Sequence, residues 1–390
     1  MKVKVGVFFG GKSVEHEVSI ISALQAVPFF DGARYDAVPV YIARDGNMYV
    51  GERVGRIEEY KDIPRLIAKS RRVVGVQEDN RLLLVRYPVR RFGSSIECAI
   101  DVAFPIVHGT NVEDGALQGY FRTMSVPFVG CDVTASAVGM DKHVTKAALK
   151  DAGIPVWDSR RVFVKSFFRN TEKILREIGN EFPFPVIVKP FNLGSSIGIK
   201  KAADAMELRE ALEYAFQYTD NALVGPVVKN LREINCAVLG DQESAVASEC
   251  EEPIGVDAIL SYSDKYVSGG KAKGMSAAKR KLPADIPAET RDTIRRLAVE
   301  TFQALRCNGV SRVDFLLDDS GGLWVNEINT IPGSLSFYLW EPVGMPYGDL
   351  LDRLIQLALK RERENAAVSY SFDTNILANF SSGGTKGLKN

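Results

Sequence analysis

The stretch SRVDFLLDDSGGLWVNEINTIPG, residues 311–333, decides the fold of this chain. Two short apolar runs are separated by a Gly-Gly turn, which predicts a β-hairpin. Because side chains alternate along a strand, Arg312 and Asp314 share one face of the first strand. Glu327 and Asn329 do the same on the second. Two carboxylates and an amide converging from paired strands suit Mg²⁺, although an ordinary exposed face of solvated charges would have the same pattern.

The composition is that of a globular protein long enough for two or three domains. The chain has 390 residues with 49 basic and 49 acidic side chains. Because the net charge is zero, it does not indicate binding to nucleic acid or to an acidic membrane surface. No apolar run approaches transmembrane length, and the N-terminus lacks the pattern of a signal peptide. Five scattered cysteines without CxxC spacing are typical of reduced thiols. We therefore expect a cytoplasmic protein without a nucleic-acid or membrane partner.

The first part of the chain predicts an α/β domain with a parallel sheet. Strands are predicted at residues 2–9, 36–43 and 98–108, and the last is an almost continuous apolar run. Glu17 lies near the start of a helix that follows a glycine turn, where a carboxylate either complements the helix dipole or binds a substrate ammonium group. His108 ends the apolar run, where open α/β sheets bind ligands. It either faces a ligand or terminates the strand by hydrogen bonding.

The central part carries a candidate phosphate-binding loop. Residues 186–190 predict a strand that includes Lys189, and residues 192–198 read NLGSSIG. The backbone N–H groups of such a loop, together with Ser195 and Ser196, can lie along triphosphate oxygens while Lys189 supplies a point charge. A β-hairpin turn without function is the alternative.

Two later stretches suggest further nucleotide contacts. Residues 221–240 predict two strands, on which Glu233 could accept hydrogen bonds from ribose hydroxyls. Residues 261–287 are rich in Gly and Lys, which favours a mobile lid over a polyanion, with a solvated basic loop as the alternative. The polar tail, residues 365–390, is expected to be flexible.

Six motifs in order are similar to those of the D-alanine–D-alanine ligases, which belong to the ATP-grasp superfamily. The matching stretches are EHEVSIISA (residues 15–23), HGTNVEDGALQGY (108–120), PFVGCDVTASAVGMDKHVTK (127–146), VIVKPFNLGSSIGI (186–199), SRVDFLL (311–317) and NEINTIPG (326–333). The resemblance implies an α/β (α+β) protein of three domains, with ATP held between antiparallel sheets of the second and third. We expect the domains at residues 1–139, 140–225 and 226–364, followed by the tail.

The resemblance also implies a mechanism and a set of site residues. The carboxylate of a first D-alanine takes the γ-phosphoryl group of ATP, and the amine of a second displaces phosphate from the acyl phosphate. The implied metal ligands for two Mg²⁺ ions, with Mn²⁺ as an alternative, are Asp314, Glu327 and Asn329. The implied ATP-binding residues are Lys142, Lys189, Ser195, Ser196, Glu233 and Lys265.

Substrate and catalytic roles follow from the same likeness. Arg312 and the backbone N–H of Gly333 would stabilise the tetrahedral oxyanion. Glu17 would receive the ammonium group of the first substrate, beside His108, and Ser336 the carboxylate of the second. The family's catalytic hydrogen-bond set corresponds to Glu17, Ser195 and Tyr266.

Four departures from the family pattern limit what the resemblance implies. Val112 stands where the family usually has glycine. The hinge that grips adenine usually includes a Glu-Lys pair, but residues 223–228 read LVGPVV. The segment after Gly333 is several residues shorter than in the family, and the lid is longer and basic. The last two changes fall on the acceptor side.

The leading hypothesis is therefore a D-alanine–D-alanine ligase for peptidoglycan precursor synthesis, expected to be a homodimer through its first domain. The same chemistry with D-serine, D-lactate or another acceptor is the close rival, and Tyr266 argues against lactate. A non-catalytic nucleotide-binding regulator is the alternative from another class. A protein that only binds a nucleotide does not need the complete set of candidate site residues, which argues against this alternative.

Overall fold

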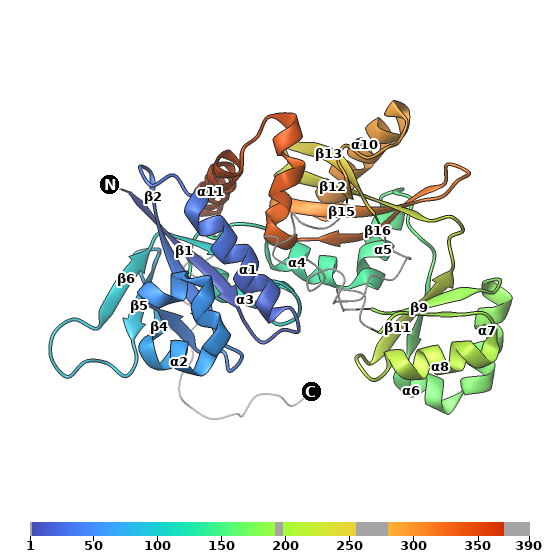
Figure 1. Ribbon diagram of the computed structural model, residues 1–390, viewed down its shortest axis with the longest axis horizontal. Helices are drawn as coiled ribbons and strands as arrows, with labels where there is room; N and C mark the ends of the chain where they lie inside the picture. The colour runs from blue at the N-terminus through green and yellow to red at the C-terminus, as the bar shows by residue number, and fades with distance from the viewer. Residues whose placement is uncertain (1, 192–197, 255–279, 370–390) are drawn as a thin grey trace, which may run out of the picture.

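Three β-sheets organise the molecule (Figure 1). The computed structural model describes residues 2–191, 198–254 and 280–369. In Figure 1 a seven-stranded sheet lies at the left, a five-stranded sheet at the upper centre, and a four-stranded sheet with its helices at the lower right. The predicted α/β class with three sheet-containing parts is confirmed.

The seven-stranded sheet has the order β6-β5-β4-β3-β2-β1-β7. Its strands are β1 (Val3–Gly10), β2 (Tyr35–Ile42), β3 (Met48–Val50), β4 (Arg71–Glu78), β5 (Arg81–Arg86), β6 (Ile96–Ile100) and β7 (Val102–Pro105). Strands β2, β1 and β7 are parallel, whereas the others pair antiparallel. The sheet is therefore mixed, not parallel throughout as expected. Short turns such as Asp79–Asn80, both with positive φ (49° and 58°), join β4 and β5, and such turns allow only antiparallel pairing.

The apolar run at residues 98–108 belongs to two strands instead of the single strand expected. Strand β6 pairs with β5, and β7 pairs with β1. Asp101 stands between them, where its carboxylate accepts a hydrogen bond from the Lys4 backbone N–H at 2.8 Å and pairs with Arg81 at 2.8 Å. These partners allow the charged Asp101 to interrupt the apolar run.

The second and third sheets are antiparallel, as the resemblance implied. The four-stranded sheet, in the order β10-β9-β11-β8, contains β8 (Arg160–Phe163), β9 (Val186–Pro190), β10 (Lys200–Ala202) and β11 (Asn221–Pro226). The five-stranded sheet, in the order β14-β13-β12-β15-β16, contains β12 (Arg232–Gly240), β13 (Ala245–Pro253), β14 (Arg280–Lys281), β15 (Gly309–Leu317) and β16 (Leu323–Asn329). The hairpin predicted first in the sequence is β15–β16.

Helices cover these sheets. The α-helices are α1 (His16–Ala26), α2 (Ile63–Lys69), α3 (Ala116–Thr123), α4 (Val133–Met140), α5 (Lys142–Asp151), α6 (Val164–Arg169), α7 (Thr171–Glu181), α8 (Ala205–Ala215), α10 (Ala288–Ala304) and α11 (Tyr347–Ala366). Short 3-10 turns are η1 (Val27–Phe29), η2 (Glu52–Gly55), η3 (Ile57–Asp62), η5 (Gly333–Leu339) and η6 (Glu341–Val343). Helix α5 ends just before Gly153, whose φ of 73° suits a glycine that stops a helix.

The hydrophobic cores cross the expected domain boundaries. Apolar residues of α11, including Leu350, Leu354 and Ile355, share a buried core with α1 and with β1 of the seven-stranded sheet. Leu149 of α5 packs in the core beneath the five-stranded sheet. The last helix thus packs against the N-terminal lobe. The three sequence segments stay a prediction about domain limits.

No helix in the described part of the chain is both long and apolar enough to cross a membrane. All five cysteines are free thiols, and four of them are buried. Their burial fits the expectation that they fill the core.

Candidate active site

The β15–β16 hairpin brings four polar side chains to one face. In the register of the two strands Arg312 lies opposite Asn329, and Asp314 lies opposite Glu327. The Asp314 carboxylate accepts two hydrogen bonds from Arg312, at 2.6 and 2.7 Å, and one from the Asn329 amide at 3.0 Å. The face predicted from alternation is therefore real and internally connected.

Arg312 and Asp314 form a buried ion pair. Their side chains are only 14% and 3% exposed. Burial lowers the pKa of the Arg312 guanidinium, but the facing Asp314 carboxylate outweighs burial and holds that pKa well above its usual value. Arg312 is therefore a fixed cation with a bidentate orientation.

Two lysines from other elements reach this face. Lys142 is the first residue of α5, and Asp141 caps that helix by accepting from the backbone N–H groups of His143 and Val144. The Lys142 ammonium lies 3.0 Å from Glu327. Lys189, near the end of β9, donates to the side-chain oxygen of Asn326 on β16 at 3.4 Å.

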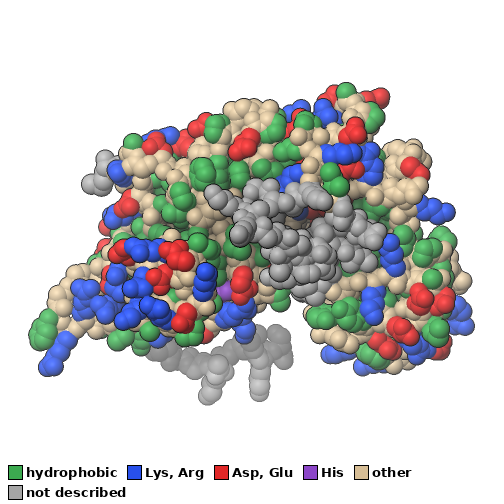
Figure 2. Space-filling view, viewed as in Figure 1, with side chains coloured by type: hydrophobic (Ala, Val, Ile, Leu, Met, Phe, Trp, Pro, Cys, Tyr) green, Lys and Arg blue, Asp and Glu red, His purple; other side chains and the backbone are tan. Residues whose placement is uncertain are grey.

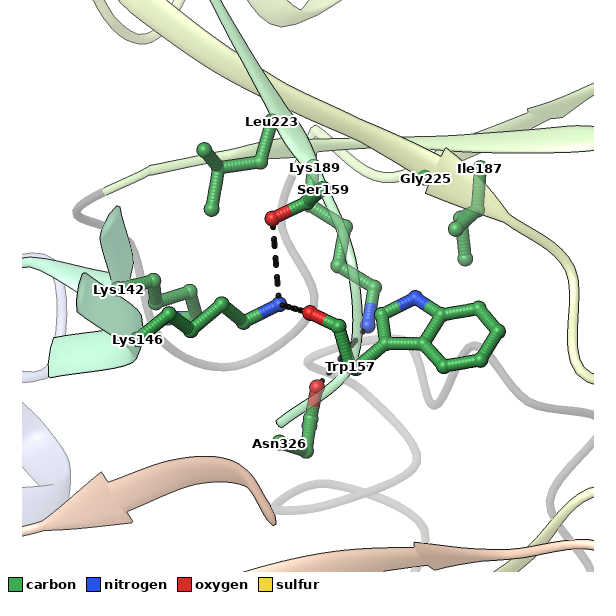
Figure 3. Close-up of a pocket in the computed structure, with 9 residues that line it drawn as sticks. All are labelled: Lys142, Lys146, Trp157, Ser159, Ile187, Lys189, Leu223, Gly225 and Asn326. Atoms are coloured by element: carbon green, nitrogen blue, oxygen red, sulfur yellow. Dashed lines mark hydrogen bonds between the residues drawn. The ribbon is translucent and has the colours of Figure 1, made fainter. Parts of the chain in front are cut away.

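A pocket opens where these elements meet (Figure 3). It encloses about 270 Å³, including space open to solvent, and its lining residues are Lys142, Lys146, Trp157, Ser159, Ile187, Lys189, Leu223, Gly225 and Asn326. Apolar side chains from β9 and β11 form one part, and the ammonium groups form another. Such a division suits a ligand with an apolar ring and an anionic end.

Lys146 is a pocket residue that the sequence analysis missed. Its ammonium group donates to the Trp157 carbonyl at 2.8 Å and to the Ser159 hydroxyl at 3.3 Å, as Figure 3 shows. Burial, together with the positive charges of Lys189 and Lys142, lowers the pKa of Lys146 to about 7. Its spacing of four residues from Lys142 puts both on one helix face, which was the available signal.

This lowered pKa predicts that binding of a polyanion in the pocket depends on pH. An anionic triphosphate in the pocket favours the charged lysine, so we expect proton uptake on ATP binding that is larger at pH 8 than at pH 7. Calorimetry in two buffers of different ionisation enthalpy measures this uptake. Lys146→Met should abolish it, whereas Lys150→Met, on the exposed side of α5, should retain it. Equal uptake in both variants would contradict the assignment.

The structure separates Glu17 from the position expected for it. The Glu17 side chain is 53% exposed and pairs with Arg44 at 2.7 Å. Glu15 is buried instead and acts electrostatically on His108 and Glu113. Glu15, and not Glu17, thus lies in the enclosed region, and the substrate contact expected for Glu17 stays a prediction.

Glu15 lies against the loop that follows β7. A Cβ added to Gly109 would lie 3.0 Å from a Glu15 carboxyl oxygen, so glycine permits this close approach. Burial and the nearby Glu15 carboxylate raise the pKa of Glu113 to about 8, although hydrogen bonds from the backbone N–H groups of Gly109 and Ile331 act in the opposite direction. Two acidic side chains thus share one enclosed region.

His108 does not present a ring nitrogen to a ligand. The side chain is buried, and Nδ1 lies 3.0 Å from the Ile331 carbonyl oxygen while Nε2 lies 3.0 Å from the Ser22 hydroxyl. Both ring nitrogens are therefore engaged within the protein. In the structure His108 connects the N-terminal lobe to the loop after β16, and the substrate contact expected for it stays a prediction.

The acceptor-side candidate Ser336 sits in a left-handed turn. Ser334, Leu335 and Ser336 have φ of 49°, 55° and 48°, a conformation that costs about 1–2 kcal/mol for each such residue. Ser336 is fully buried, and its hydroxyl has no hydrogen-bond partner within the described ranges. A buried hydroxyl left open in a strained turn fits a ligand-binding position.

The remaining candidates are placed as follows. Gly333 begins the η5 turn, two residues before Leu335. Glu233 is exposed on β12, on the same sheet face as Asn235, the residue opposite Asp314. Four candidates lie outside the described residues, namely Ser195, Ser196, Lys265 and Tyr266, as does most of the predicted lid.

The donor set around Asp314 fits a hard divalent cation. The structure contains no group of three or more His, Cys, Asp or Glu side chains suited to a metal within the described ranges. Two carboxylates and the Asn329 amide can nevertheless hold Mg²⁺ when ATP phosphates and water supply the other ligands. In this structure those carboxylates are engaged by Arg312, Asn329 and Lys142.

Two antiparallel sheets that meet at a lysine-lined pocket, with carboxylates at its edge, define an ATP-grasp protein. Models of the D-ala D-ala ligase N-terminus and C-terminus match residues 4–131 and 148–356. The chain belongs to the D-alanine–D-alanine ligase family.

Individual relatives agree with this assignment. The chain is 37% identical to a D-alanine–D-alanine ligase of Thermosipho africanus, covering 96% of this chain and 98% of that protein. It is similar to the solved D-alanine–D-alanine ligase from Coxiella burnetii (TM-score 0.76, 31% identity, 94% and 96% covered). It is equally similar in TM-score to the VanG D-Ala:D-Ser ligase from Enterococcus faecalis (0.76, 32% identity, 92% and 100% covered).

Proposed function

We propose that this chain is an ATP-dependent ligase that joins two D-alanine molecules through an acyl phosphate. The product would be D-alanyl-D-alanine for peptidoglycan precursors in the cytoplasm. The observation that carries the proposal is the face of Arg312, Asp314, Glu327 and Asn329 held beside the Lys142 ammonium. A binding protein without catalysis needs no such combination.

The nucleotide end of the site supplies charge and alignment. Phosphoryl transfer depends more on neutralising and orienting the triphosphate than on a protein nucleophile. Lys142, Lys146 and Lys189 line the pocket and would face the phosphates, while Ile187 and Leu223 would contact adenine. When bound at Asp314, Glu327 and Asn329, Mg²⁺ would neutralise phosphate charge. Two ions, or Mn²⁺ in their place, belong to the same proposal.

The donor end would bind the first D-alanine by its ammonium group. Glu15 suits this role because its carboxylate is buried in the loop region beside Gly109. The tetrahedral intermediate formed in the second step carries an oxyanion. Arg312 and the Gly333 backbone N–H would stabilise it, since preorganised donors act strongly where water is excluded.

The second substrate, which supplies the attacking amine, distinguishes a D-Ala-D-Ala ligase from a D-Ala:D-Ser ligase. Ser336 would receive the carboxylate of the second substrate through its open hydroxyl. Likeness to a D-Ala:D-Ser ligase as strong as that to a D-Ala-D-Ala ligase keeps D-serine as the second candidate.

The test is phosphate release from Mg-ATP with D- and L-amino acids, offered singly and in pairs, and with D-lactate. We expect D-alanine alone to give phosphate and dipeptide in equal amounts. Release only with a second, different substrate would retain the mechanism and change the acceptor. No phosphate release with any of these substrates would contradict the proposal and favour a nucleotide-binding regulator.

A homodimer through the N-terminal lobe is a further part of the proposal. On one face of β4 the exposed side chains are Arg72, Val74, Val76 and Glu78, and the two valines are 36% and 44% exposed. A twofold axis near Gly75 would place Arg72 of one copy beside Glu78 of the other, with the valines in contact. Arg and Lys side chains gather on this lobe in Figure 2.

The dimer is tested by charge reversal. Arg72→Glu and Glu78→Arg should each convert the dimer to monomer, and the double variant should restore it because the pair is re-formed with opposite polarity. Light scattering during gel filtration measures the mass, with Lys69→Glu as an exposed control. A monomeric wild type, or singles that remain dimeric, would rule out this interface.

A further inference from the structure

The loop around Gly333 is held by side chains from the N-terminal lobe. Three of them, Ser22, His108 and Glu113, are named the clasp below. They contact the backbone at Ile331 and Ser334, which flank Gly333 on both sides. These contacts join segments separated by 218 to 312 residues in sequence, so only the tertiary fold creates them.

The hydrogen bonds fix the direction of each donor. The Ile331 carbonyl can only accept, so His108 Nδ1 carries the proton and donates to it at 3.0 Å. The Ser22 hydroxyl accepts from the Ser334 backbone N–H at 3.1 Å and lies 3.0 Å from His108 Nε2. Because burial lowers the pKa of His108, the ring is neutral, and Nε2 accepts the proton of the Ser22 hydroxyl. A neutral histidine and one serine link the two sides of Gly333.

Glu113 completes the clasp on the other backbone group of Ile331. One carboxyl oxygen accepts from the Ile331 N–H at 3.1 Å, and the other accepts from the Gly109 N–H at 2.9 Å. Both the N–H and the carbonyl of Ile331 are thus bonded to the N-terminal lobe. In addition, the Ser334 hydroxyl donates to Gln25 at 2.7 Å.

The strain of the adjoining turn explains why such anchoring is needed. Three successive residues after Gly333 adopt left-handed φ values, which isolated chains populate poorly. Side chains that bind the backbone at Ile331 and Ser334 can offset this cost. The orientation of the Gly333 N–H, which lies between them, then depends on the clasp.

We infer that Ser22, His108 and Glu113 are positioning residues that aim the Gly333 backbone N–H at the oxyanion of the ligation step. This inference rests on the ligase chemistry proposed above. Ser22, His108 and Glu113 do not line the pocket proposed for ATP. The clasp should therefore affect attack of the amine on the acyl phosphate, in which the carbonyl oxygen gains charge and phosphate leaves, more than the preceding transfer of phosphate from ATP.

Rapid-quench single turnovers with Mg-ATP and the substrates found active for wild type separate the two steps. Ser22→Ala removes one hydroxyl from α1, and we expect dipeptide formation to slow by about 10- to 100-fold. The rate of ADP formation and the KM for ATP should stay within about threefold of wild type, because the ATP pocket is unchanged. Glu113→Gln provides a second variant, since an amide cannot accept from both backbone N–H groups.

Ser136→Ala is the matched control. Like Ser22, Ser136 is a buried serine on a helix, but its hydroxyl donates to the Cys131 backbone carbonyl, outside the clasp. The substitution should leave both rates unchanged. Equal slowing of ADP and dipeptide formation in the clasp variants would overturn the inference, as would wild-type rates for both. Failure of the proposed function is recognised separately, because wild type itself would then release no phosphate.

Discussion

Glu327→Gln is expected to lower phosphate release by at least about 1,000-fold while the protein stays folded. The substitution keeps the size of the side chain but removes one of two carboxylates on the β15–β16 face. It also leaves Lys142 without its ion pair at 3.0 Å. Because the Glu327 side chain is 26% exposed, the melting temperature should change by only a few degrees. Phosphate release under saturating substrates measures the first effect, and thermal unfolding the second.

Binding of Mn²⁺ with ADP, followed by electron paramagnetic resonance, gives a readout that does not depend on turnover. We expect weaker Mn²⁺ binding in Glu327→Gln and wild-type binding in Asp319→Asn, a control in the exposed turn of the same hairpin. Wild-type turnover and Mn²⁺ binding in Glu327→Gln would remove this residue from the metal site.

Arg312→Lys is expected to reduce kcat by about 100- to 1,000-fold. Lysine keeps the charge but cannot form the two parallel hydrogen bonds that Arg312 makes to Asp314 at 2.6 and 2.7 Å. Asp314 is only 2% exposed, so its carboxylate would lose one of the hydrogen bonds that offset the cost of burying its charge. The melting temperature should therefore fall as well. The KM for ATP should change little because Arg312 does not line the nucleotide pocket.

The matched control for this prediction is Arg295→Lys. Arg295 lies on α10 and donates to the Ala247 carbonyl at 3.2 Å, away from the polar face. Steady-state kinetics of both variants decide the question. An Arg312→Lys enzyme with wild-type kcat would show that a point charge suffices and that bidentate geometry has no catalytic value.

Much of the nucleotide side could be predicted from sequence because its signals are local. Alternation along β15 and β16 places Arg312 and Asp314 on one face, and the observed register adds their partners opposite. Lys142 and Lys189 follow from short motifs and do line the pocket. Their specific contacts with ATP stay predictions.

On the donor side the sequence could not show which of two acidic residues is enclosed, and the cause is helical geometry. Glu15 and Glu17 are two residues apart at the start of α1, and each helical residue turns the side chain by about 100°. The two carboxylates therefore point to nearly opposite sides. Sequence identifies both as acidic residues near a helix start, but only packing shows that Glu15 faces the loop at Gly109 while Glu17 faces Arg44.

The sequence by itself determined the family, the polar face of the β15–β16 hairpin and, through the family resemblance, the antiparallel second and third sheets. Periodicity and contiguous motifs carry these because they are properties of neighbouring residues. Only the tertiary structure decided that His108 binds the Ile331 backbone, that Lys146 lines the pocket, and that α11 packs on the N-terminal lobe. Those contacts join segments far apart in the chain. They are set by how the sheets and helices bury their apolar faces against one another, which no local pattern encodes.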